Sequence, residues 1–298
     1  MTTNNYDFGD QTVQLEKFDL RNLAFNDKGE FVNPRIAIIA KSGSGKSYVI
    51  RAIMYFMHQI GVKCGTVIAP TDKMNKFYED FVPEVFINHE YKPDTIQDFM
   101  NRQRRIIDKN TERVKEGKKP IDPRAYLIMD DCMSSKHLWL KDPLILSIFN
   151  EGRHFQISPF ILSMQYSIGI GPELRNNFDF VFLLGEDTYS SRRKLHEHYA
   201  GIFRTFDLFD QVFTQVTDNY GCMVLNNRLR SSDIKKKVFW FRAHVPPKFT
   251  LGSKKVLKFN KKYYDEDHDK HQNNVDLSTL GGSRRKQIIK VTKVDSSK

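Results

Sequence analysis

The chain has 298 residues, a 40% hydrophobic content and a formal net charge of +11. This length and composition can bury a sizeable core and indicate one large α/β domain with additions. No apolar run reaches the roughly 18 residues that span a bilayer, and the first residues lack the features of a secretory signal, so neither is expected. Three widely spaced cysteines suit reduced thiols and exclude a cysteine-built zinc site: Cys64, Cys132 and Cys222.

A lead-in, a strand, a glycine loop and a helix are predicted in the first part of the chain. Residues 1–34 carry scattered apolar positions, and an apolar run at 35–40 predicts a buried strand. After the loop, apolar residues recur at helical spacing, and Gly61 follows at the position of a helix-ending glycine. The recurring positions are Val49, Ile53, Phe56, Met57 and Ile60.

The loop between this strand and helix has the composition of a phosphate-binding loop. Its glycines let backbone N–H groups converge on phosphate oxygens, Lys46 can reach the β- and γ-phosphates, and Ser47 can ligate Mg²⁺. Ala40 stands where the usual pattern has glycine, a small departure. The expected nucleotide-binding residues are Ser42, Gly43, Ser44, Gly45, Lys46, Ser47 and Tyr48. A plain Ser/Gly turn is the alternative interpretation.

Strands and helices alternate through the rest of the chain. Further strands are predicted at 64–69, 125–130, 159–164, 179–184 and 221–225, and a charged surface helix at 94–117. Such alternation predicts an α/β fold with a mostly parallel sheet covered by helices on both faces.

Two carboxylates end the strand predicted at 125–130. An acidic residue at the end of a neighbouring strand holds Mg²⁺ in P-loop enzymes, and Asp130 is assigned that role. Asp131 would then project toward the γ-phosphate and activate the attacking water, although glutamate is usual there. Two solvated aspartates at an exposed strand end are the alternative.

Gln165 ends the next predicted strand. Ligands of open parallel sheets lie outside the carboxyl ends of the strands, so Gln165 is expected beside the γ-phosphate, where it could contact phosphate or water. A glutamine that merely ends a strand is the alternative.

The C-terminal part is strongly basic. Between Lys235 and Lys262 there are ten Lys/Arg and no acidic residue, and such runs attract polyanions. The predicted divisions are a lead-in at 1–34, an ATPase domain at 35–245 and a basic extension at 246–298 that ends in a disordered tail. A solvated surface is the alternative to a DNA contact. The candidate DNA-binding residues are Lys235, Lys236, Lys237, Lys254, Lys255 and Lys258.

Six motifs together resemble one protein family. They are Ser42–Ser47, Val67–Thr71, Leu127–Asp131, Asn150–His154, Ser163–Gln165 and Glu173–Asp179. In this order they are similar to the poxvirus-type genome-packaging ATPases of large nucleocytoplasmic DNA viruses, which belong to the FtsK/HerA group. The resemblance covers about residues 31–245.

The resemblance implies an ATP- and Mg²⁺-dependent motor that pumps double-stranded DNA into a capsid. It implies a homo-oligomeric ring, capsid or portal-vertex partners, and a location in the host cytoplasm at viral assembly sites, with virion association. The strand ending in Gln165 should lie between the strands bearing Lys46 and Asp130. An arginine from one subunit usually completes the site of the next; Arg153 is the first candidate and Arg175 the second, and a surface arginine is the alternative for each.

Other functions remain open on the sequence. An ATP-binding assembly or regulatory subunit without translocation activity is the main alternative. A GTPase is disfavoured because no Asn-Lys-x-Asp motif is present. A terminase nuclease is disfavoured because the basic C-terminal region carries no clustered carboxylates.

Overall fold

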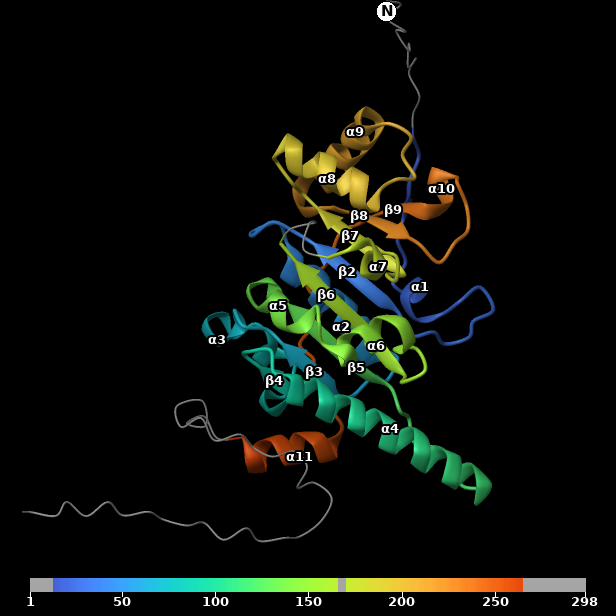
Figure 1. The fold of residues 1–298 in the computed structure, drawn as a ribbon, viewed down its shortest axis with the longest axis vertical. Coiled ribbons are helices and arrows are strands. Elements are labelled where there is room, and N and C mark those ends of the chain that lie inside the picture. Colours follow the sequence, from blue (N-terminus) through green and yellow to red (C-terminus); the bar gives the residue numbers. More distant parts are fainter. Residues whose placement is uncertain (1–12, 166–169, 265–298) are drawn as a thin grey trace, which may run out of the picture. The chain divides into compact units, whose positions relative to one another are not determined.

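The computed structural model describes residues 13–165 and 170–264. Within this part of the chain, nine strands form one sheet in the order β1-β9-β8-β7-β2-β6-β5-β3-β4 (Figure 1). All neighbours run parallel except β7 with β8 and β8 with β9. The strands are β1 Glu16–Lys17, β2 Arg35–Ile39, β3 Gly65–Ile68, β4 Ile87–Asn88, β5 Ala125–Asp130, β6 Ile157–Met164, β7 Phe180–Leu184, β8 Cys222–Asn226 and β9 Val238–Phe241.

Helices connect most of these strands. The longest is α4, whose bounds lie within two residues of the predicted surface helix. The α-helices are α1 Arg21–Ala24, α2 Lys46–Gln59, α3 Asp72–Asn75, α4 Pro93–Lys115, α5 Lys136–Trp139, α6 Pro143–Glu151, α7 Pro172–Arg175, α8 Tyr189–Tyr199, α9 Phe206–Thr217, α10 Ile234–Lys237 and α11 Lys254–Tyr263. Short 3₁₀ turns are η1 Tyr78–Asp80, η2 Glu84–Phe86, η3 Cys132–Ser135 and η5 Asp218–Tyr220.

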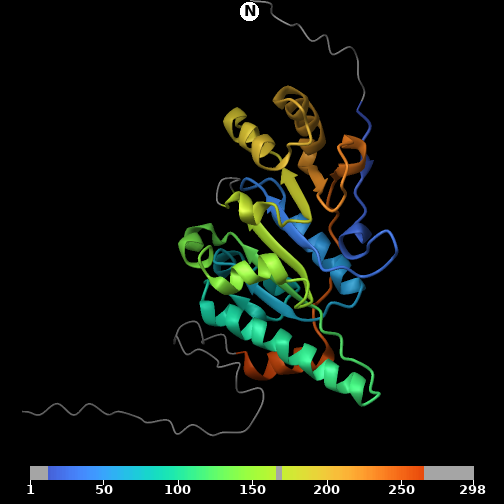
Figure 2. The ribbon, with the colours of Figure 1, turned by 45° about the vertical axis from the view of Figure 1, so that its right-hand side comes forward.

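Each face of the sheet carries its own apolar cluster. Side chains of a strand alternate between faces, and along β2 Ala37 and Ile39 join one cluster while Ile36 and Ile38 join the other. The first cluster packs against α4, α6 and α9, and the second against α2 (Figure 2). The predicted α/β class, with a mostly parallel sheet covered on both faces, is confirmed.

The described part of the lead-in packs on the sheet. Phe18 is buried against Phe180, Phe182 and Phe239, with ring centroids 5.5–5.7 Å apart. Residues 1–12 and 265–298, which include the predicted disordered tail, lie outside the described residues.

The segment after β9 runs across the sheet, from the side that holds β1 and β9 to the side that holds β3 and β4. Leu251 is fully buried, and its N–H donates to the carbonyl of Phe81 over 2.7 Å. Helix α11 then packs at η2, where Asn260 accepts the N–H of Val85 over 3.0 Å. The divisions after residues 34 and 245 stay predictions. Among the described residues, no helix has the length and apolar character needed to cross a membrane.

Candidate nucleotide site

A glycine loop joins β2 to α2 at the carboxyl edge of the sheet. Gly43 has φ 79° and Gly45 has φ 97°, conformations that residues with a Cβ rarely adopt. Gly45 is the N-cap of α2, so the free N–H groups and positive end of the helix dipole face the loop. Ala40 lies outside the positive-φ region, which explains why alanine is tolerated where the usual pattern has glycine.

Lys46 lies between two carboxylates. Its Nζ is 3.1 Å from Oδ1 of Asp130 and forms a second ion pair with Asp131. All three side chains are at most 14% exposed. Because β5 carries the carboxylates and is separated from β2 by β6, the lysine reaches across the end of one intervening strand. The sequence had predicted these three residues to meet.

Tyr78 is a residue of this site that the sequence did not reveal. Its hydroxyl donates to Oδ2 of Asp130 over 2.9 Å, and its side chain is 1% exposed. Burial first, and the charge of Asp130 second, raise the pKa of Tyr78 well above its usual value. The hydroxyl therefore stays protonated and acts as a fixed donor. The segment around Tyr78 carries no motif or periodicity that would have indicated this contact.

Asp131 leaves the strand in a left-handed conformation. Its φ is 53°, and its N–H donates to the carbonyl of Ser163 over 3.3 Å. This turn directs its carboxylate to Lys46, on the same side as that of Asp130. With a nucleotide bound, phosphate oxygens would compete for Lys46 and release the Asp131 carboxylate.

The donor atoms present fit a magnesium ion. Asp130 supplies a carboxylate held by Tyr78, and Ser47 supplies a hydroxyl in the first turn of α2. The buried Oγ of Ser163, paired in register with Asp130, makes no hydrogen bond within the described residues. Mg²⁺ prefers a few such oxygens, with water and phosphate completing its shell. Ser47 and Asp130 are the residues that would hold it.

Gln165 directly follows β6, and its side chain is exposed. The sheet order places β6 between β2 and β5, as the resemblance had implied. Gln165 therefore lies at the carboxyl edge between the glycine loop and the two aspartates. Its proposed contact with phosphate or water stays a prediction.

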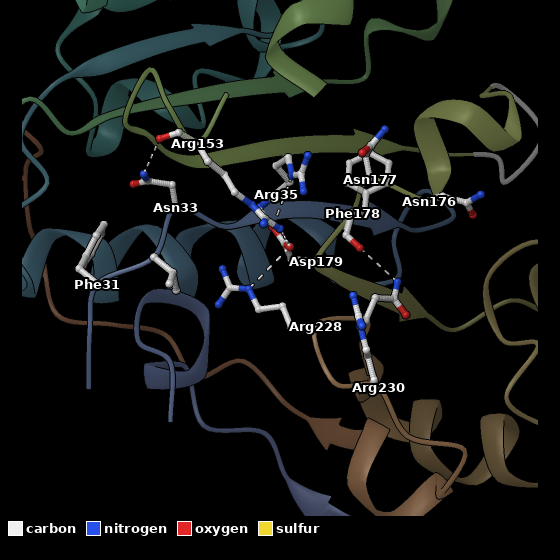
Figure 3. A pocket seen from close by; sticks show the side chains of 12 residues that line it. Phe31, Asn33, Arg35, Arg153, Asn176, Asn177, Phe178, Asp179, Arg228 and Arg230 are labelled. Atoms are coloured by element: carbon white, nitrogen blue, oxygen red, sulfur yellow. Dashed lines mark hydrogen bonds and ion pairs between the residues drawn. The ribbon is translucent and has the colours of Figure 1, made fainter. Parts of the chain in front are cut away.

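Arg153 lies at the opposite, amino edge of the parallel strands. It pairs there with Asp179, together with Arg35 at 3.5 Å and Arg228 at 3.7 Å (Figure 3). These residues and Arg230 line a cavity of about 590 Å³. Burial lowers the pKa of Arg35 and of Arg228, and the charge of Arg153 adds to this effect. Arg153 is thus remote from the glycine loop of its own chain.

Arg175 ends the short helix α7. Its guanidinium lies over the ring of Tyr199, 5.9 Å from the ring centre. Arg153 and Arg175 therefore do not join Lys46 within one chain, and their assignment as residues that act on a neighbouring subunit stays a prediction.

The basic candidates do not form one surface. Lys235, Lys236 and Lys237 belong to α10, next to β9 toward one edge of the sheet. Lys254, Lys255 and Lys258 belong to α11, which packs at η2, next to β4 at the other edge (Figure 1). A contact with DNA would have to use the two groups separately.

Comparison with known proteins decides the family. A profile of the family described as Poxvirus A32 protein matches residues 17–179, more than half of the chain. The chain belongs to the poxvirus A32 protein family. This membership, with the loop and carboxylates described above, makes it a P-loop ATPase of the packaging type found in large DNA viruses.

Viral relatives match over most of their lengths. Uncharacterized protein L437 of Acanthamoeba polyphaga mimivirus is 41% identical over 255 residues, 86% of each chain. Uncharacterized protein 075L of Invertebrate iridescent virus 6 is 30% identical over 88% of this chain and 98% of its own. Among solved structures, the genome packaging NTPase B204 of Sulfolobus turreted icosahedral virus 2 with ATP-gammaS is similar at 15% identity. That match has a TM-score of 0.47 over 72% of this chain and 98% of B204.

Proposed function

We propose that this ATPase is a motor that translocates double-stranded viral DNA into a capsid. The observation that carries the proposal is the position of Lys46 between Asp130 and Asp131, one strand away from Gln165. This is a site for hydrolysis as well as binding, because it combines a cation for the phosphates with carboxylates for metal and water. Family membership and the description of B204 as a genome packaging NTPase support packaging as the task.

The chain's residues have separate roles in the proposed reaction. Backbone N–H groups of the loop and Lys46 would hold and orient the β- and γ-phosphates. Mg²⁺, when bound, neutralises phosphate charge. Asp130 would hold it, Asp131 would accept a proton from the attacking water, and Gln165 would contact the water or the γ-phosphate.

The working unit would be a homo-oligomeric ring at the capsid or portal vertex. Arg153 lies at the amino ends of the parallel strands, opposite its own glycine loop. Its side chain is 53% exposed, so the guanidinium is accessible to another subunit. In the cell, the proposed place of action is the host cytoplasm at viral assembly sites, with carry-over into the virion.

Phosphate release measured with and without double-stranded DNA tests the proposal. A motor should hydrolyse ATP several-fold faster with DNA, and the Lys46→Ala variant should lose both rates. The alternative, an ATP-binding assembly or regulatory subunit, predicts slow turnover that DNA does not change. That result with a folded, ATP-binding protein would overturn translocation and leave the ATP site intact.

A further inference from the structure

A strained turn stands beside the phosphate loop. The turn η5 precedes β8, and two successive residues in it, Asn219 and Tyr220, have φ of 49° and 60°. Positive φ is unfavourable for a bulky side chain, so such residues persist only where the surroundings impose them. Tyr220 is nevertheless 67% exposed. The side chain is thus held in an unfavourable backbone conformation without being buried in the core.

The surroundings of this turn fix its shape. A Cβ on Gly221 would lie 2.1 Å from the carbonyl oxygen of Val216, so a larger residue could not close the turn. The Asp218 carboxylate accepts the N–H of Asn219 over 2.8 Å. Arg242 donates to the carbonyl of Asp218 over 3.3 Å from the end of β9. The position of Tyr220 is therefore built into the fold.

The Tyr220 ring stands beside the end of the phosphate loop. A Cβ built on Gly45 would lie 3.6 Å from Cδ1 of Tyr220 and 3.8 Å from its Cβ. Gly45 is the residue at which α2 begins. One edge of the tyrosine thus lies next to Gly45, while most of its surface faces solvent beside the phosphate site.

The sheet order shows which end of a nucleotide would meet this ring. Asp130 and Asp131 mark the γ-phosphate end, and they lie on β5, on one side of β2. An extended nucleotide whose phosphates occupy the loop must direct its base away from β5. On that other side of β2 stand β7 and β8, and Tyr220 lies just before β8.

We propose that Tyr220 forms a base subsite on which the nucleobase of the bound nucleotide stacks. Its ring offers an apolar face at the start of α2, and aromatic stacking requires no hydrogen-bond readout of the base. The subsite rests on the nucleotide site alone and is independent of DNA translocation. The left-handed backbone at Tyr220 directs the ring toward the ligand instead of into the core, which explains why the strained turn is kept.

Binding of ATP and of inorganic tripolyphosphate to the full chain, with Mg²⁺, tests the proposal. Tripolyphosphate has no base, so it reports the phosphate loop alone. Tyr220→Ala should raise the dissociation constant of ATP about tenfold and leave that of tripolyphosphate unchanged. Tyr220→Phe keeps the ring and should bind ATP like wild type. Tyr263→Ala, which removes another exposed tyrosine on α11, is the matched control and should change neither constant.

Two outcomes would overturn the base subsite. One is unchanged ATP binding by Tyr220→Ala, and the other is an equal loss of ATP and tripolyphosphate, which would make Tyr220 a support of the loop. Lys46→Ala tests the phosphate site itself, because it should weaken the binding of both ATP and tripolyphosphate. Unchanged binding of both ligands by Lys46→Ala would show that the phosphate site is wrongly assigned. If Tyr220→Ala does not fold, Tyr220→Leu, which keeps apolar bulk without a π-face, takes its place with the same expected split.

Discussion

Tyr78 and Asp130, 52 residues apart in the sequence, form a buried hydrogen bond in the nucleotide site. The phenol occupies Oδ2 of the carboxylate and leaves Oδ1 facing Lys46. A carboxylate fixed in this way presents one defined oxygen toward the phosphate loop. Partners that orient a metal-binding carboxylate typically change metal affinity 10- to 100-fold when removed, as an order of magnitude.

The Tyr78→Phe variant should therefore need roughly tenfold more Mg²⁺ for half-maximal ATP turnover. Tyr126→Phe is the matched control, because the Tyr126 hydroxyl is buried without a hydrogen-bond partner in the described part of the chain. It should keep the wild-type Mg²⁺ requirement. Magnesium titrations of phosphate release compare the two. Equal Mg²⁺ curves for both variants would show that the Tyr78 hydroxyl does not orient a metal-binding group.

Lys46→Ala should reduce ATP turnover by at least about a hundredfold, because it removes the cation aimed at the developing phosphate charge. Lys63→Ala, which removes an exposed lysine near β3, should be near wild type. Asp130→Ala should abolish the Mg²⁺ dependence together with activity, and Asp131→Asn should bind ATP without hydrolysing it. Phosphate release and ATP binding measure these effects. Normal turnover by purified Asp131→Asn would assign water activation to another group.

Arg153 should act across a subunit boundary. If so, mixing Arg153→Ala with Lys46→Ala protein restores some sites, because one interface then combines an intact loop with an intact arginine. Recovery of phosphate release is the measurement, with subunit exchange confirmed by labelled protein. Lack of recovery, with normal activity of Arg153→Ala alone, would transfer the role to Arg175 or another residue.

Asp179→Asn should destabilise the fold by about 3 kcal/mol, since it leaves the buried Arg35 and the partly buried Arg228 without their shared carboxylate. Arg153→Ala should cost less than about 1 kcal/mol, because that side chain is half exposed. Urea unfolding of both variants provides the free energies. A smaller loss for Asp179→Asn than for Arg153→Ala would contradict this ranking.

Replacing Lys254, Lys255 and Lys258 by glutamine should weaken DNA binding and flatten its salt dependence. Each lost phosphate contact reduces the slope of log K against log[salt] by about 0.9. The control is the same charge change at Lys109 and Lys115, in the last turns of α4, and at Lys119, just beyond its end. The DNA affinities of both triple variants, measured at several salt concentrations, give the two slopes. ATP turnover without DNA should stay unchanged. If both triple variants have the wild-type slope, α11 does not contact DNA.

Much of the fold was readable from local patterns. The strands predicted at 35–40 and 159–164, among others, begin and end within two residues of those observed, because buried strands are short apolar runs between turn residues. The glycine loop and the aspartates at the end of β5 were found in the same way, because each is contained in one short segment. The position of the Gln165 strand between β2 and β5 was implied by the family resemblance.

Other features depend on segments far apart in the sequence. The Tyr78 hydroxyl meets Asp130 only after the chain passes through α4. The antiparallel direction of β8 could not be predicted from its apolar sequence, since strands of either direction can be equally apolar. The basic stretch from Lys235 to Lys262 looks continuous, yet residues 242–253 carry the chain from one end of the sheet to the other.

Because β8 runs antiparallel to β7, it starts at the carboxyl ends of the parallel strands and finishes at their amino ends. The five-residue strand begins beside the turn of Tyr220 and ends at Asn226, two residues before Arg228. The strand is about 17 Å long, and it is paired with β7 on one side and β9 on the other. Because both ladders hold its register, β8 fixes the distance between the turn of Tyr220 and the arginine group around Asp179.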